Sequence, residues 1–202
     1  MSEVVGADEP GIEAARRALE EGEAVVFPTD TVYGLGARPR AAGRLFEIKG
    51  RPRELTLPVL AAGVEDAREV ARFDERAEAL AAAFWPGGLT MVLPRAEAST
   101  GWDLGEHRQT VGVRVPDADV ARSLLSTTGP LAVTSANPSG EPTGATCEEV
   151  RTALGETVAV YVCAGAASGG TPSTVVDLTG ELRVLRPGAV PAEDVARVLE
   201  RG

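Results

Sequence analysis

The sequence predicts an α/β fold, with a mixed β-sheet in a single domain. Short apolar segments typical of buried strands alternate irregularly with segments of helical spacing, which is the pattern of this fold class. With 202 residues, of which 44% are hydrophobic, the chain can bury one sizeable core. Neither a repeat nor a long linker divides the sequence, so we expect one domain.

The first half of the chain alternates between predicted helices and strands. Residues 11–21 place apolar side chains on one side of a helix, and Gly22 follows as a stop signal. The later elements are a buried strand at 24–27, a helix at 40–48, a strand at 57–60, one or two alanine-rich helices within 65–84, a turn at 85–88 and a strand at 89–93.

The second half continues this alternation with longer connections. Residues 95–109 are polar and are expected to form a loop, and residues 137–146 are rich in Pro, Gly, Ser and Thr, as exposed loops are. A flexible glycine-rich connection is expected at 165–171. The strands are expected at 111–115, 131–135, 158–162, 174–178 and 182–185, and the helices at 119–125, 148–154 and 192–201.

The chain is acidic, with a net charge of −10 and an isoelectric point of about 4.7. A protein that holds duplex nucleic acid over a wide surface needs a basic face, so this balance argues against a tightly held nucleic acid. A small anionic ligand in a locally positive cleft is compatible with it.

Nothing in the sequence indicates a membrane-bound or secreted protein. No apolar run approaches the ~18 residues of a membrane span. The N-terminal residues have neither the basic flank nor the apolar centre of a signal peptide. Cys147 and Cys163 fit neither a disulfide framework nor a zinc site. We therefore expect a cytoplasmic protein with no membrane partner, in which both cysteines are reduced.

Polar side chains gather where the predicted strands begin or end. In an α/β domain, polar groups at strand ends usually line one crevice, and these hydroxyl, amide and guanidinium groups suit an anionic nucleotide. Each cluster alone is an ordinary set of turn residues, so the prediction depends on all five together. The clusters are Thr29–Thr31, Arg114, Thr134–Asn137, Ser173–Thr174 and Arg186–Gly188.

Three basic residues are the most informative single positions. Lys49 is the only lysine beside 19 arginines, and lysine is a compact charge that can follow a phosphate or change its pKa. Lys49 and Arg51 follow a predicted helix, so we expect a cationic clamp on a triphosphate and name both as catalytic candidates. Arg114 has no acidic neighbour in sequence before Asp117, so we expect its guanidinium to be free for a ligand carboxylate.

Other familiar chemistries lack their residues. Gly165–Gly170 has no GK[ST] ending of a P-loop, and no GxGxxG follows a strand. His107 has no second ligand at metal spacing, so we expect a solvated loop residue and no protein metal site. Asp177 lacks the partner carboxylate of a glycosidase, and Trp85 is expected in the core.

Seven sequence blocks occur in a fixed order: Pro28–Gly36, Lys49–Pro52, Trp85–Thr90, Val111–Pro116, Ser135–Asn137, Ser173–Asp177 and Leu185–Gly188. In this order they resemble the YrdC/TsaC-type threonylcarbamoyl-AMP synthases. The resemblance covers roughly residues 11–200, which we take as one such domain, and it is closest to the short, single-domain members. It implies a twisted α/β sheet around a concave ligand cleft, in agreement with the expected crevice.

The resemblance also implies a reaction. L-Threonine, bicarbonate and ATP would give L-threonylcarbamoyl-AMP and pyrophosphate, which makes the chain a nucleotidyltransferase. A separate transferase complex would then modify the adenosine next to the anticodon of certain tRNAs, while tRNA binding by this chain is expected to be weak or absent. Mg²⁺ is expected to be held mainly by the ATP phosphates and by water.

The same resemblance assigns residues to each substrate. L-Threonine is expected to contact Thr31, Arg114 and Ser173, with Arg114 on its carboxylate. Leu55 and Leu60 stand where some members carry polar groups that contact ligands. The residues expected to contact ATP are Lys49 at the phosphates, Arg51, Thr110, Ser135, Asn137, Thr143 and Arg186.

Two alternatives belong to other classes of function. An RNA-binding module would use the same concave surface without adenylation chemistry, and the acidic balance weighs against it. The carbamoyl-adenylate domain of hydrogenase-maturation carbamoyltransferases is a related enzyme. Those proteins carry an acylphosphatase domain and cysteine-rich zinc modules, for which two cysteines are too few.

Overall fold

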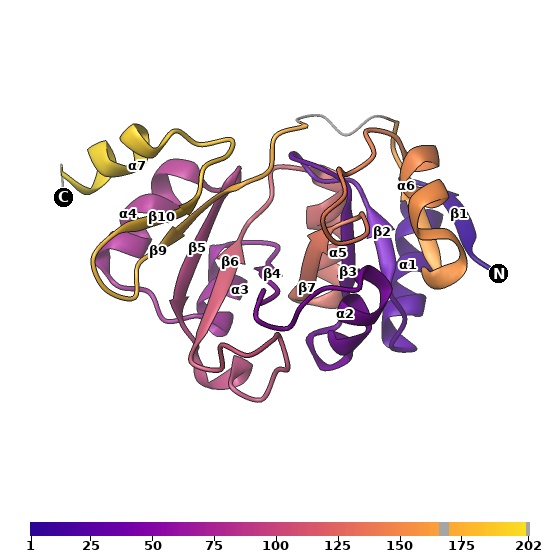
Figure 1. Ribbon diagram of the computed structural model, residues 1–202, viewed down its shortest axis with the longest axis horizontal. Helices are drawn as coiled ribbons and strands as arrows, with labels where there is room; N and C mark the ends of the chain where they lie inside the picture. Colours follow the sequence, from indigo (N-terminus) through magenta and orange to yellow (C-terminus); the bar gives the residue numbers. More distant parts are fainter. Residues whose placement is uncertain (166–169, 201–202) are drawn as a thin grey trace.

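The computed structural model describes residues 1–165 and 170–200, in which ten strands form one mixed sheet (Figure 1). The strand order is β1-β8-β2-β3-β7-β4-β6-β5-β9-β10, and β1 and β10 lie at opposite ends of the molecule. Parallel and antiparallel ladders are both present, which confirms the predicted fold class. The strands are β1 (Glu3–Gly6), β2 (Val25–Phe27), β3 (Gly34–Ala37), β4 (Val59–Leu60), β5 (Leu89–Pro94), β6 (Thr110–Arg114), β7 (Leu131–Ser135), β8 (Val160–Cys163), β9 (Thr174–Asp177) and β10 (Arg183–Arg186).

Helices cover both faces of the sheet. Along β2, Val25 and Phe27 pack in the core cluster that contains α1 and α5, whereas Val26 packs in the other cluster, because successive side chains of a strand point to opposite faces. No described helix is long and apolar enough to span a bilayer. The α-helices are α1 (Glu9–Glu20), α2 (Gly43–Lys49), α3 (Val64–Val70), α4 (Glu75–Phe84), α5 (Asp119–Thr128), α6 (Cys147–Leu154) and α7 (Ala192–Leu199).

Strand β3 is not among the strands expected from the sequence. Gly34 and Gly36 lie in β3, which pairs antiparallel with both β2 and β7. A Cβ atom on Gly36 would lie 2.8 Å from Cε1 of Phe27, so glycine permits the close packing of the two strands. Strand β1 was also not predicted, and it lies ahead of residue 11, where the predicted domain begins.

The boundaries of α2 explain how the chain reaches the cleft. The helix predicted at 40–48 is a short 3₁₀ turn, Pro39–Ala41, followed by α2. Gly50 ends α2 in the left-handed conformation, with φ of 60°, which glycine adopts at low cost. The chain turns there, and Arg51 lies directly after the turn.

The remaining boundaries agree in outline with the predictions. The alanine-rich region at 65–84 forms two helices, α3 and α4. The indole Nε1 of Trp85 donates to the Leu89 carbonyl in the core, and His107 is exposed. Most of the predicted glycine-rich connection, residues 166–169, and residue 201 of the predicted last helix lie outside the described residues.

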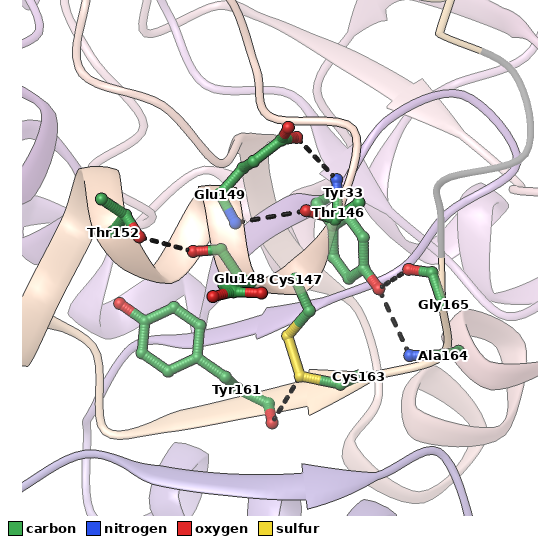
Figure 2. Close-up of a disulfide and its surroundings, with 10 residues drawn as sticks. All are labelled: Tyr33, Thr146, Cys147, Glu148, Glu149, Thr152, Tyr161, Cys163, Ala164 and Gly165. Carbon is green, nitrogen blue, oxygen red and sulfur yellow. Dashed lines mark hydrogen bonds between the residues drawn. A yellow bond between two sulfur atoms is a disulfide. The ribbon is translucent and has the colours of Figure 1, made fainter.

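Cys147 and Cys163 form a disulfide, so the expectation of two reduced cysteines is wrong (Figure 2). Cys147 begins α6 and Cys163 ends β8, with their Cα atoms 5.5 Å apart. The pairing depends on where α6 packs beside β8, which two cysteines in a sequence do not reveal. The two cysteines are 16 residues apart in sequence. Closing a loop of this length stabilises a fold by about 3 kcal/mol in the chain-entropy model.

Candidate functional site

A cleft of about 510 Å³ opens along strands β3, β7, β4, β6 and β5, which are consecutive in the sheet. The ends of these strands and the loops beside them supply its lining, and its volume is that of a small-molecule site. The predicted site residues that line it are Thr31, Arg51, Arg114, Ser135, Asn137, Thr143, Ser173 and Arg186.

Arg114, at the end of β6, is buried in the cleft wall and is not free as expected. Its guanidinium forms an ion pair with Asp30, and its Nη1 donates to Thr31 Oγ1 at 3.0 Å. Its Nε donates to the Gly87 carbonyl at 2.8 Å. The acidic partner is 84 residues away in sequence, so local spacing did not reveal it. Arginine carries five N–H donors, so this pairing still leaves donors for a ligand.

A hydroxyl network lies beside Arg114 on the cleft wall. Ser173 Oγ and Thr90 Oγ1 share a hydrogen bond of 2.9 Å, and Arg186 Nη2 donates to Ser173 Oγ at 3.0 Å. Gly188 packs against the same segment, where a Cβ atom would lie 2.3 Å from the Pro172 carbonyl oxygen. The Arg-Pro-Gly block therefore holds Arg186 against Ser173.

The loop of residues 135–145, which begins at the last residue of β7, forms another part of the lining. Asn137 organises it: its Nδ2 donates to the carbonyls of Pro138 and Glu141, and its Oδ1 accepts from Thr143 Oγ1 at 3.0 Å. A carboxamide with every atom paired inside one loop fixes the conformation of that loop. Ser135 and Thr143 are thereby held at the cleft surface.

Two predicted site residues do not line the cleft. Lys49 is only 4% exposed, and its ammonium donates to the carbonyls of Ser135 and Asn137 beneath the 135–145 loop. Burial, and secondarily Arg51, lowers the pKa of Lys49 to about 8. Thr110 begins β6, at the other end of the strand from Arg114, and pairs with Pro94.

The cleft is positive although the chain is acidic. Arg51, Arg114 and Arg186 line it, and burial lowers the pKa of each guanidinium. Arg186 further lowers the pKa of Arg51, and Arg114 that of Arg186, because the three charges lie near one another. Three cations, beside the Asp30 carboxylate on Arg114 and Glu141 in the lining, leave a positive balance that favours a polyanionic ligand.

Several lining residues were not assigned to either substrate from the sequence. Thr29 fixes the corner after β2 by donating to the Val32 carbonyl at 2.6 Å, and Thr90 supports Ser173. The sequence could have pointed to Thr90 as a site residue, because it is a polar residue between Leu89 and Met91 in a buried strand. Within residues 1–165 and 170–200, no three metal-binding side chains are close enough to hold a cation.

The family model for Sua5, YciO and YrdC proteins, described as "Telomere recombination", matches residues 17–188. A Mycobacterium tuberculosis protein named putative threonylcarbamoyl-AMP synthase is 44% identical over 194 residues, which are 94% of this chain and 89% of that protein. Both findings extend over the segments that build the cleft.

Solved structures share the fold. Pyrococcus abyssi Sua5, crystallised with L-threonine, has a TM-score of 0.88 and 35% identity over 98% of this chain. The alignment spans 61% of the Sua5 chain. Escherichia coli YciO has a TM-score of 0.86 and 27% identity, covering 96% of this chain and 98% of its own.

Proposed function

The chain belongs to the Sua5/YciO/YrdC family, and on that premise we propose that it is an L-threonylcarbamoyl-AMP synthase. The enzyme is a nucleotidyltransferase that converts L-threonine, bicarbonate and ATP into L-threonylcarbamoyl-AMP and pyrophosphate. The observation that carries this proposal is one cleft with three guanidinium groups beside a hydroxyl network, in the fold of a protein crystallised with L-threonine.

The threonine half of the cleft is assigned to Thr31, Arg114 and Ser173. The remaining donors of Arg114 are suited to the substrate carboxylate, and the Ser173 hydroxyl to the substrate's polar groups. Asp30 keeps Arg114 in place and screens one of its edges. The amine of threonine stays free to react, because the cleft lining near Arg114 fixes the carboxylate end.

The nucleotide half is assigned to Arg51, Ser135, Asn137, Thr143 and Arg186. Its guanidinium groups would neutralise the phosphate chain, and the 135–145 loop would orient it. Thr110 lies away from this surface, so an ATP contact there stays a prediction that the cleft lining does not support. Bound Mg²⁺ would be carried by the phosphates, where it supplies further charge neutralisation.

The reaction follows from holding the two substrates together. The neutral amine attacks the carbon of bicarbonate, and loss of water leaves a carbamate. The carbamate oxygen attacks the α-phosphorus, the bond to the β-phosphate breaks, and pyrophosphate leaves. This sequence needs alignment and charge stabilisation and no covalent enzyme intermediate.

The wider role is also a proposal. The product would pass to a threonylcarbamoyl transferase complex that modifies tRNA in the cytoplasm. An RNA-binding module without chemistry is disfavoured, because a net charge of −10 repels the phosphate backbone.

Pyrophosphate release is expected to require both L-threonine and bicarbonate. L-Serine in place of L-threonine should lower kcat/KM by about 10–200-fold, because a missing methyl group in a fitted pocket costs roughly 1–3 kcal/mol. A coupled pyrophosphate assay with each component omitted in turn measures this. Equal release without threonine or bicarbonate would contradict the proposed function.

A further inference from the structure

Lys49 holds the 135–145 loop from two directions. Its ammonium donates to the carbonyls of Ser135 and Asn137 and, at 3.3 Å, to Oδ1 of Asn137. Its own carbonyl accepts a hydrogen bond of 2.9 Å from the backbone N–H of Ser139. The last residue of α2 therefore fixes the first turn of a loop whose outer side lines the cleft.

We propose that Lys49 is a positioning residue whose ammonium holds Ser135 and Asn137 in the conformation that receives ATP, without forming the surface that touches it. This inference rests on the proposed function for the identity of the nucleotide. It replaces the cationic clamp expected from the sequence, in which Lys49 and Arg51 both contact the triphosphate. Arg51 lines the cleft, and Lys49 lies behind the loop.

The geometry also accounts for a lone lysine in an arginine-rich chain. Three oxygen acceptors converge on one nitrogen, which matches the three N–H donors of an ammonium group. A guanidinium is planar and larger, and it would displace a loop that leaves Lys49 only 4% exposed. Arginine at position 49 should therefore fail to hold the 135–145 loop in place, although Lys49→Arg keeps the positive charge.

The charge state of Lys49 gives the inference a pH signature. Its pKa is lowered from 10.5 to about 8 by burial and by Arg51, so the group loses its proton as the pH rises through that value. The neutral amine has two N–H donors for three acceptors, and one loop oxygen then loses its partner. ATP affinity should therefore be highest below pH 8 and decline above it.

The charged groups around Lys49 do not share this behaviour. Arg51 follows α2, Glu141 lies on the same loop, and Arg114 and Arg186 line the cleft beyond it. Guanidinium and carboxylate groups do not change charge between pH 7 and 9. Titration with ATP alone, without threonine and bicarbonate, prevents turnover and removes the substrate amine from the experiment.

The test is calorimetric titration of ATP into the wild-type protein, Lys49→Met, Lys49→Arg and the control Arg44→Met. Arg44 is an exposed cation on α2, paired with Glu23 and absent from the cleft lining. Both Lys49 variants should bind ATP more weakly by on the order of tenfold or more, as when buried acceptors lose their partner. Threonine affinity should change less than twofold, and Arg44→Met should match the wild type.

The same titrations between pH 7 and 9.5 separate positioning from general structural support. Wild-type affinity should fall through about pH 8, and binding at that pH should take up protons, seen as a dependence of the binding enthalpy on the buffer. Lys49→Met should show neither effect. The pH dependence of the wild-type protein needs no variant, so it tests the role of Lys49 even if a variant fails to fold.

Two results would overturn the inference. One is full ATP affinity in Lys49→Arg, and the other is a flat wild-type profile across pH 8. Either result leaves pyrophosphate release by the wild-type enzyme intact. A wild-type protein that releases no pyrophosphate would instead contradict the proposed function.

Discussion

Arg51→Ala is expected to lower kcat by a factor on the order of 10²–10³, the cost of removing one preorganised group that stabilises developing charge. Arg51 lines the cleft beside Arg186, and its Nε donates to the Leu55 carbonyl at 2.7 Å, which fixes the side chain before any ligand arrives. In the proposed reaction, a guanidinium held in this way would stabilise the phosphate charge that develops as pyrophosphate leaves. Pyrophosphate release at saturating substrates measures the effect.

The matched control is Arg53→Ala, two residues along the same segment. Arg53 pairs with Asp103, stacks over the Phe46 ring and does not line the cleft. It should keep its kcat within about threefold of the wild type, since partly exposed ion pairs contribute little. Equal losses in both variants would show that the segment matters for its shape and that Arg51 has no special role.

Arg114→Ala is expected to lower the free energy of unfolding by about 3–5 kcal/mol and to abolish measurable threonine binding. The stability loss arises because Asp30, with a side chain 15% exposed, keeps a carboxylate that has lost its cation. The loss of binding arises because the substrate carboxylate has no other assigned guanidinium. Denaturant unfolding and calorimetric titration of threonine measure the two effects separately.

A second substitution, at Asp30, separates the effect of Arg114 on stability from its effect on threonine binding. Asp30→Asn combined with Arg114→Ala removes the unpaired carboxylate, so stability should partly recover while threonine binding stays lost. Arg122→Ala is the control, because Arg122 pairs with Asp119 outside the cleft and the Asp119 side chain is 96% exposed. Recovery of threonine binding in the double variant would refute the role given to Arg114.

Apolar spacing predicted most of the fold. Helix α1 was predicted closely because burial of one face leaves a period in the sequence, and strand β7 because it begins with a short apolar run that is buried throughout. Strand β3 was missed because Gly34 and Gly36 carry no hydrophobic period, and their role depends on Phe27 from another strand. Strand β1 was missed because its side chains are mostly exposed.

The candidate site was predicted where strand ends carry polar side chains. Arg114, Ser135 and Ser173 lie around one cleft because their strands are close in the sheet. The sequence could not reveal the contacts between side chains that lie far apart along the chain. Asp30 meets Arg114 from 84 residues away, and Lys49 meets Asn137 from 88 residues away.

The disulfide was missed for the same reason. Cys147 and Cys163 belong to two elements, α6 and β8, that meet only in the folded structure, so the sequence alone does not show that they pair. Tyr33 lies close by: its hydroxyl donates to the Gly165 carbonyl at 2.6 Å and accepts from the Ala164 N–H at 3.2 Å (Figure 2). Both links fasten the end of β8 to the rest of the sheet.

The most direct test follows the atoms of the two small substrates into the nucleotide. The enzyme is incubated with ATP, labelled bicarbonate and labelled L-threonine, and the nucleotide products are separated and counted. The proposed reaction predicts one adenylate that carries both labels in equal amounts, formed with an equal amount of pyrophosphate. An adenylate that carries threonine without the bicarbonate carbon, or pyrophosphate formed with unlabelled AMP alone, would contradict it.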